Sequence, residues 1–305
     1  MRLLGRLPPQ SFFLVSAVFH YLGPSLAVLL FARMDVLGVA WLRIVSGAAL
    51  FAVWRRPWRL VARLDTRERW MLVQLGVVIA AMNCVFYLAV ARLPLSTVGA
   101  IEFFATVLLA AWGARTGRNV AALVLAAFGV LTISDVRITG QPLGFAFAFA
   151  NCALFMAYVI LGHRIANTEH GAPPGMRNRM GGIDRLAAAM IVAAFVVTPV
   201  GFGGTVPEIM QPWLLLAGVG VGVCSSVIPY VTDQLAMARL PRATFALMLA
   251  LLPMFAVIIG AAVLSQIPTI QDLVGIALVA VGVALHQVPS SETEPSNERD
   301  DPWTT

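Results

Sequence analysis

Apolar runs, each close to 20 residues long, recur along almost the whole chain. An α-helix rises about 1.5 Å per residue, so a run of this length can cross the hydrocarbon core of a bilayer. Apolar residues make up 59% of the 305 residues and charged residues 12%, against about 25% charged residues in a soluble domain. A soluble chain of this size could not bury so many helices on all faces. The sequence therefore predicts an all-α polytopic membrane protein.

The apolar runs predict ten transmembrane helices. Their expected ranges are 11–31, 36–54, 70–91, 95–113, 119–135, 142–161, 182–202, 213–235, 241–264 and 269–287. The first run is long for a secretory signal and lacks an evident cleavage site, so we expect it to be retained. Residues 165–181 are expected to form a Pro- and Gly-containing loop. Residues 1–10 are expected to be a cytoplasmic N-terminus, and the polar residues 288–305 a disordered cytoplasmic tail.

The four residues Ala-Arg-Leu-Pro occur twice, at 91–94 and again 147 positions later at 238–241. Each copy lies between two apolar runs. This repetition predicts two copies of one five-helix module, residues 11–135 and 142–287. Because five is an odd number, the second module must be inverted in the membrane relative to the first. Many secondary transporters are built from such inverted repeats, with the substrate site between the copies.

The arginine residues orient the predicted helices. Loops on one side carry a dense set that includes Arg55, Arg56 and Arg59, whereas the opposite loops carry Arg33, Arg92 and Arg137. Arginine is enriched in the cytoplasmic loops of membrane proteins. The bias therefore predicts a multi-pass membrane protein with both termini in the cytoplasm.

Several function classes are disfavoured. The net charge of +6 lies in loops and does not indicate a nucleic-acid partner, and a chain without lysine has no Walker-type nucleotide site. The three cysteines lie inside apolar runs and lack metal-ligand spacing, so no metal or cofactor is expected. Aspartyl chemistry needs two neighbouring carboxyl groups, but Glu102 is expected toward the outer face and Asp233 toward the inner face. The sequence therefore does not predict an enzyme.

Few ionisable residues fall inside the predicted helices, and such residues are functional candidates by default. Glu102 and Arg43 each lie about seven residues below the outer end of a helix, at a depth of about 10 Å. They can pair, which would offset the cost of burying them, or Arg43 can extend its side chain to the headgroups. Asn83 and Tyr87 lie near the same depth, so these four side chains can line one polar cavity.

The second half offers polar candidates of its own. Tyr230 follows Asn83 by the same 147 positions, which places it on the opposite wall of the expected cavity, and Ser226 lies four residues before it. Pro229 and Pro253 are expected to free backbone carbonyl groups inside their helices. Asp233 and Arg185 lie near helix ends, where a structural role is the simpler expectation.

The sequence resembles the ten-helix EamA-type transporters of the drug/metabolite transporter superfamily, and among them the bacterial threonine/homoserine exporters. Three differences affect what the resemblance implies about the substrate. Similar exporters have Gly-Pro shortly after the glutamate where this chain has Ala105 and Thr106. They often have Glu before a proline where this chain has Leu252 before Pro253, and Gly-Glu where it has Ser265 and Gln266. The resemblance rests on residues of both halves, namely Arg56 to Leu60, Met82-Asn83, Phe86 to Leu88, Glu102-Phe103, Tyr158, Gly162, Arg164, Glu169 to Gly171, Pro229-Tyr230, Arg239 to Pro241 and Thr244-Phe245.

The resemblance implies an exporter of small metabolites, such as threonine, homoserine or their analogues, working by proton antiport and alternating access. Glu102 would carry the proton, and Arg43 would either tune that carboxyl group or bind a substrate carboxylate. A broad exporter of amphiphilic drugs or other metabolites is the alternative. The expected partners are a small-molecule substrate, protons and the lipid bilayer, and the sequence is also compatible with a homodimer.

Overall fold

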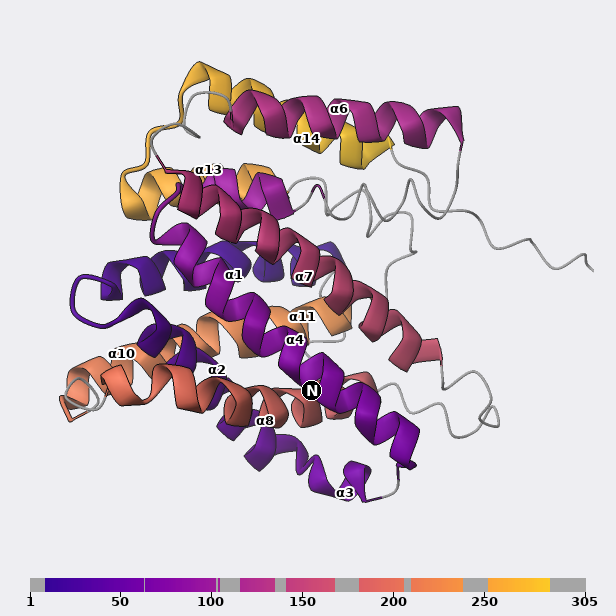
Figure 1. Ribbon diagram of the computed structural model, residues 1–305, viewed down its shortest axis with the longest axis vertical. Helices are drawn as coiled ribbons and strands as arrows, with labels where there is room; N and C mark the ends of the chain where they lie inside the picture. The colour runs from indigo at the N-terminus through magenta and orange to yellow at the C-terminus, as the bar shows by residue number, and fades with distance from the viewer. Residues whose placement is uncertain are drawn as a thin grey trace, which may run out of the picture.

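The computed structural model describes residues 9–62, 64–102, 104, 116–134, 141–167, 181–205, 210–237 and 252–285. The regular elements in these ranges are all helical (Figure 1). An additional helix begins at residue 95 and is described to residue 102. The labelled helices are α1 (Pro9–Leu30), α2 (Val36–Arg55), α3 (Trp58–Val61), α4 (Thr66–Val90), α6 (Gly117–Ser134), α7 (Pro142–Asn167), α8 (Gly181–Gly201), η2 (Gly203–Thr205), α10 (Pro212–Gly222), η3 (Val223–Val227), α11 (Ile228–Met237), α13 (Leu252–Leu264) and α14 (Ile270–Leu285).

Within the described ranges, six helices are long and apolar enough to cross a membrane. They are Ser11–Leu30, Val36–Arg55, Thr66–Val90, Pro142–Leu161, Ile183–Gly201 and Pro212–Thr232. Shorter apolar helices cover Gly117–Thr132, Met254–Leu264 and Ile270–Gly282. The chain is therefore an all-helical, polytopic membrane protein. The count of ten stays a prediction, because residues 105–115 and 238–251, with the second Ala-Arg-Leu-Pro turn, lie outside the described residues. The expected loop 165–181 is shorter than predicted, since α7 continues to Asn167 and α8 begins at Gly181. The rest of that loop and the tail 288–305 lie outside the described residues.

The helices form an elongated bundle in which segments distant in sequence lie together (Figure 1). Helix α6 packs along α14, α4 packs on α7 and α8, α2 packs on α8 and α10, and α1 packs on α11 and α13. Glycines permit the closest approach between α6 and α14. A Cβ atom on Gly129 would lie 2.5 Å from the carbonyl oxygen of Gly275, and one on Gly282 would lie 2.7 Å from that of Ala122. Small residues serve the same purpose in many membrane helix pairs.

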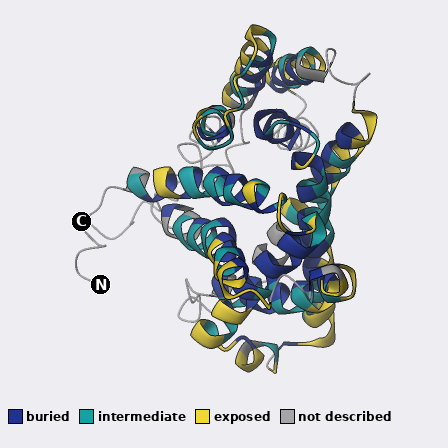
Figure 2. Ribbon diagram, turned by 90° about the vertical axis from the view of Figure 1, so that its left-hand side faces the viewer, coloured by how far each residue is buried: buried dark blue, intermediate teal, exposed yellow. Residues whose placement is uncertain are grey.

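Exposed residues lie on the outside of the bundle and buried ones between the helices (Figure 2). Many of the exposed side chains are large and apolar, including Phe128, Phe195 and Leu216. A soluble protein rarely exposes so much contiguous apolar surface. A surrounding bilayer explains this surface, because lipid tails are as apolar as these side chains.

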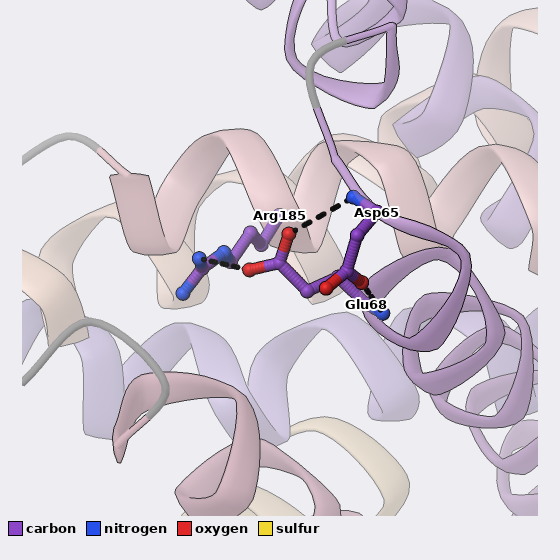
Figure 3. Close-up of polar contacts among 3 residues, drawn as sticks. All are labelled: Asp65, Glu68 and Arg185. Carbon is purple, nitrogen blue, oxygen red and sulfur yellow. Dashed lines mark hydrogen bonds and ion pairs between the residues drawn. The ribbon is translucent and has the colours of Figure 1, made fainter. Parts of the chain in front are cut away.

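Ion pairs connect the C-terminus of α2 and the N-termini of α4 and α8. Arg55 Nε lies 2.6 Å from Asp184 Oδ1, and Arg185 Nη2 lies 3.5 Å from Glu68 Oε1. Glu68 also accepts the backbone N–H of Asp65, whose side chain caps α4 in return (Figure 3). Arg185 therefore has the structural role expected from its position. The side chain of Asp233 lies outside the described residues.

The opposite ends of the helices are also joined across the sequence. Gln266, just before α14, accepts the backbone N–H of Leu95 through its Oε1 atom at 3.0 Å. This bond caps the N-terminus of the helix that carries Glu102. Ser265 beside it has a φ of 54°, a left-handed conformation that suits glycine better than serine. Gln266 thus connects the two halves of the chain, and Ser265 beside it adopts a left-handed conformation.

Candidate functional site

Arg43 on α2 lies inside the bundle with 9% of its surface exposed. Its Nε atom donates to Ser226 Oγ at 3.2 Å, and its Nη2 atom donates to the backbone carbonyl of Ser225 at 3.1 Å. Both acceptors belong to η3, about 180 residues further along the chain. The side chain therefore does not extend to the headgroups but connects the two halves of the protein.

The carbonyl of Ser225 is available to Arg43 because of Pro229. In an α-helix this carbonyl would accept the N–H of residue 229, and proline has none. The backbone there forms a π-helical turn, in which the Ile228 N–H bonds to the Val223 carbonyl. Such turns are frequent at functional sites. The prediction that Pro229 frees a carbonyl inside its helix is thus confirmed. The buried guanidinium group of Arg43 donates a hydrogen bond to that carbonyl.

Close helix contacts bring α2 to this turn. A Cβ atom on Gly47 would lie 3.3 Å from Ser226 Cβ and 3.1 Å from Met190 Cε. A Cβ atom on Gly222 would lie 2.9 Å from the Arg43 carbonyl oxygen. The backbones can approach this closely only where side chains are absent, and this approach lets Arg43 reach η3.

Helix α4 contributes Tyr87 and Asn83 to the same region. The guanidinium carbon of Arg43 lies 5.3 Å from the centroid of the Tyr87 ring, which is within the range of a cation–π contact. Tyr87 is fully buried. Asn83 is buried too, but its Nδ2 atom donates to the Ile79 carbonyl of its own helix at 2.8 Å. Of these two residues, Tyr87 is the one in contact with Arg43.

Glu102 is also buried, with 9% of its surface exposed. Its Oε2 atom accepts a hydrogen bond from Asn151 Nδ2 of α7 at 2.9 Å. Asn151 was not among the residues expected at the site. A polar amide near the middle of the apolar run 142–161 was the available signal, because such residues face the bundle interior.

Arg43 and Glu102 do not form the ion pair that the sequence allowed. Among the described residues Glu102 is bonded to a neutral amide, and Arg43 to a hydroxyl and a carbonyl group. The two opposite charges still attract each other at longer range. Each side chain instead bonds to residues of the second half of the chain.

Four buried polar atoms have no hydrogen-bond partner in the part of the chain that the structure describes. They are Tyr87 Oη, Ser225 Oγ, Asn151 Oδ1 and Thr97 Oγ1. Three of these residues touch or flank the two buried charges, Tyr87 and Ser225 at Arg43 and Asn151 at Glu102. Buried polar groups are nearly always satisfied in folded proteins, so this cluster indicates a place where a ligand, a proton or water can bind.

The other expected residues are less directly involved. Tyr230 on α11 is half-buried and packs against the core. Ser16 of α1 donates to the carbonyl of Pro229 at 3.4 Å. The three cysteines are free thiols. Within the described ranges no group of three or more His, Cys, Asp or Glu side chains is placed to hold a metal ion.

A bundle of lipid-facing helices with buried charges between its halves has the architecture of a secondary transporter. Residues 174–286 match the EamA-like transporter family. The threonine/homoserine exporter RhtA of Salmonella typhimurium (strain LT2) is 29% identical over 269 residues, which cover 86% of this chain and 85% of that protein. RhtA of Escherichia coli (strain K12) is 28% identical over 271 residues, covering 86% and 84%. The chain is thus similar to EamA-like transporters and to the RhtA exporters, which are transporters and not enzymes.

The fold also resembles a known one. A solved crystal structure of another protein, 17% identical in sequence, superimposes with a TM-score of 0.56 and covers 90% of this chain and 96% of that chain. At this identity the likeness concerns the fold alone. It extends over nearly the whole bundle, including the first half that the family match does not reach.

Proposed function

We propose that the protein exports small metabolites, such as threonine, homoserine or similar amino acids, across the bacterial inner membrane by proton-coupled alternating access. The observation that carries the proposal is Glu102, a carboxyl group buried in the bundle whose described hydrogen-bond partner is a neutral amide. An ionised carboxylate at such a place is costly, so the group must bind a proton or a cation during part of the cycle. The substrate class follows from the resemblance to RhtA.

The helix contacts support two inverted repeats. Exchanging α1 with α7, α2 with α8, α4 with α10–α11 and α6 with α14 turns most of the main contacts into another contact that is present. The contact of α4 with α7 becomes that of α1 with α11, and the contact of α4 with α8 becomes that of α2 with α10. The pairs α2–α8 and α6–α14 map onto themselves. A two-fold axis between two similar halves produces this pattern, and alternating access by rocking of one half against the other follows from such symmetry.

The contacts at the helix ends support the predicted orientation. Arg55 with Asp184, and Arg185 with Glu68, join ends that are all predicted to be cytoplasmic. Arg118 Nε donates to the Leu285 carbonyl at 2.7 Å, again between two predicted cytoplasmic ends. Gln266 and Leu95 join two predicted outer ends. Each of these contacts is compatible with helices that cross the bilayer in alternate directions.

The proposal is tested by efflux from cells loaded with radiolabelled L-threonine or L-homoserine, with and without the protein. We expect efflux to depend on the protein, to increase when an inward proton gradient is imposed, and to fall to the carrier-free rate when a protonophore collapses that gradient. Efflux of both amino acids at the carrier-free rate would refute the substrate assignment. Protein-dependent efflux that ignores the gradient would refute the proton coupling. Transport of lipophilic cations instead would favour a drug exporter.

A further inference from the structure

We propose that Arg43, together with the hydroxyl groups of Tyr87 and Ser225, binds the carboxylate group of the transported molecule. The inference rests on the proposed function in that it assumes a transported substrate, but it requires neither threonine nor proton coupling. It assigns the ligand chemistry of one subsite, a single carboxylate, to residues from α2, α4 and η3.

The first argument is the unbalanced charge of Arg43. A guanidinium group has five N–H donors, and the described contacts use Nε and Nη2, each for a neutral acceptor. The ion pairs found within 4.0 Å among the described residues involve Arg55 and Arg185, at the end of the bundle. Glu102 attracts Arg43 only from a distance and is bonded to Asn151. A buried cation without a close anion is unfavourable, and a substrate carboxylate would supply that anion.

The second argument is the fixed orientation of the guanidinium plane. The Nε atom of Arg43 donates to Ser226 Oγ, and one N–H of Nη2 donates to the Ser225 carbonyl. The guanidinium group also lies against the Tyr87 ring. The second N–H of Nη2 and both N–H groups of Nη1 have no described acceptor. A planar fork of such donors matches the two oxygens of a carboxylate and binds them in a bidentate manner. A lysine at this position would provide the charge without this geometry.

The third argument is the unpartnered hydroxyl groups beside Arg43. Tyr87 is fully buried and Ser225 is 4% exposed, and neither hydroxyl oxygen has a hydrogen-bond partner among the described residues. Each hydroxyl can donate one hydrogen bond, and a carboxylate accepts up to about four. A single carboxylate therefore has enough acceptor sites for both hydroxyls as well as for the arginine fork. A phosphate would bring a second negative charge, whereas a carboxylate matches the single positive charge of the guanidinium group.

The direct test uses the full-length protein reconstituted in liposomes and the counterflow of radiolabelled L-threonine. The competitors are unlabelled L-threonine, its methyl ester and the amino alcohol threoninol. The ester and the alcohol keep the ammonium group of threonine but lack its free carboxylate. We expect the ester and the alcohol to compete at least about tenfold more weakly than L-threonine with the wild-type protein. Arg43→Gln should weaken competition by L-threonine by about tenfold to a hundredfold and remove the preference for the free acid. Arg43→Lys should keep part of that preference.

Arg92→Gln is the matched control. Arg92 also bonds to a backbone carbonyl, that of Leu88 at 2.7 Å, and lies 5.2 Å from the ring centroid of Phe147, but it lies at a helix end. This variant should keep the wild-type preference for the free acid. An unchanged preference in Arg43→Gln, or equal competition by acid and ester with the wild-type protein, would overturn the proposal.

A second measurement decides the proposal even if threonine is not transported. The unfolding temperature of the purified wild-type protein is recorded with each of the common amino acids and with the methyl ester of each. We expect at least one free acid to raise it and its ester not to, and Arg43→Gln to abolish the shift. If esters stabilise as well as acids, or if no free acid stabilises the wild-type protein, the proposal is wrong. A stabilising acid other than threonine would refute the substrate assignment while supporting this subsite.

Discussion

At the scale of single residues, two buried charges define the molecule. Arg43 and Glu102 lie on different helices of the first half, and each bonds to a residue of the second half, Ser226 and Asn151 respectively. Both contacts must change if the halves move relative to each other. In the alternating-access mechanism that we propose, this polar site would couple a bound proton to a bound substrate.

Glu102→Gln removes the titration and keeps the shape of the side chain. If Glu102 carries the coupling proton, the variant should insert normally and still exchange internal for external substrate. Its gradient-driven efflux should fall to less than about a tenth of the wild-type rate, because a neutral amide carries no proton. The measurement compares efflux with exchange in the same liposomes.

Glu68→Gln serves as the control for that prediction. Glu68 pairs with Arg185 near the bundle end, where a partly exposed pair contributes about 0–1 kcal/mol to stability. Gradient-driven efflux should stay at the wild-type level in this variant. Gradient-driven efflux at the native rate in Glu102→Gln would instead assign Glu102 a structural role.

Ser265→Gly tests the strained connection beside the cap of the Glu102 helix. Serine at a φ of 54° adopts a conformation that costs a residue with a Cβ atom about 1 kcal/mol, while glycine adopts it freely. We expect the substitution to stabilise the protein by about 0.5–1 kcal/mol, measured as a higher unfolding temperature. Ser265→Ala keeps the Cβ atom and should give no such increase.

At the scale of helices, the break in α10–α11 is the element that builds the site. The π-helical turn η3 and Pro229 leave the Ser225 carbonyl to Arg43. The glycines that face η3 allow α1 and α2 to pack against it, since a Cβ atom on Gly23 would lie 2.7 Å from Ser225 Cα. A regular helix at this place would satisfy its own backbone and leave no free backbone carbonyl for Arg43.

Pro229→Ala restores the missing N–H group. We expect the Ser225 carbonyl to return to an α-helical hydrogen bond and Arg43 to lose an acceptor. Removing an interior proline favours the helix by up to about 3 kcal/mol, and losing a charge-assisted hydrogen bond costs about 1.5–3 kcal/mol. The unfolding temperature should therefore change little while the KM for export rises. Pro199→Ala, also inside a helix but exposed at the end of α8, should leave KM unchanged.

At the scale of the whole molecule, the polar site is not symmetric with respect to the two repeats that we propose. Adding the repeat distance of 147 to Arg43 gives Met190, which is buried and apolar. A Cβ atom on Gly47, one turn after Arg43, would touch Met190 and Ser226 together. The two halves thus meet at this point, with the charge on one side only. This asymmetry makes the first half the source of charge and the second half the source of neutral acceptors.

Reporter fusions test the inverted arrangement of the halves. A reporter after Ser290 should be cytoplasmic, and one in the loop 203–212 should lie outside, because three predicted helices separate the two points. A reporter in the loop 56–65 should agree with the one after Ser290. Agreement between the fusions at Ser290 and at 203–212 would refute the inverted repeat.

The sequence by itself determined which segments are helical and where several of them end. The length of each apolar run fixes a helix, because a backbone in lipid must satisfy its own hydrogen bonds. Asp65 and Glu68 specify the start of α4 through a capping box. Pro229 specified a free carbonyl, because proline lacks the N–H group that would have bonded to it. These features act within a few residues of each other, so the local sequence contains the information.

Only the tertiary structure decided the partners of the buried charges. Depth along a helix allowed Arg43 to meet Glu102, but depth does not fix the rotation of a helix or its neighbours. The rotation and spacing follow from packing between segments about 180 residues apart, where Gly47 and Gly222 bring α2 against η3. This packing brings Arg43 into hydrogen-bond distance of Ser225 and Ser226. Glu102 likewise bonds to Asn151 on another helix. Contacts between distant segments depend on the shape of every helix between them. The sequence alone therefore did not predict the hydrogen-bond partners of Arg43 and Glu102.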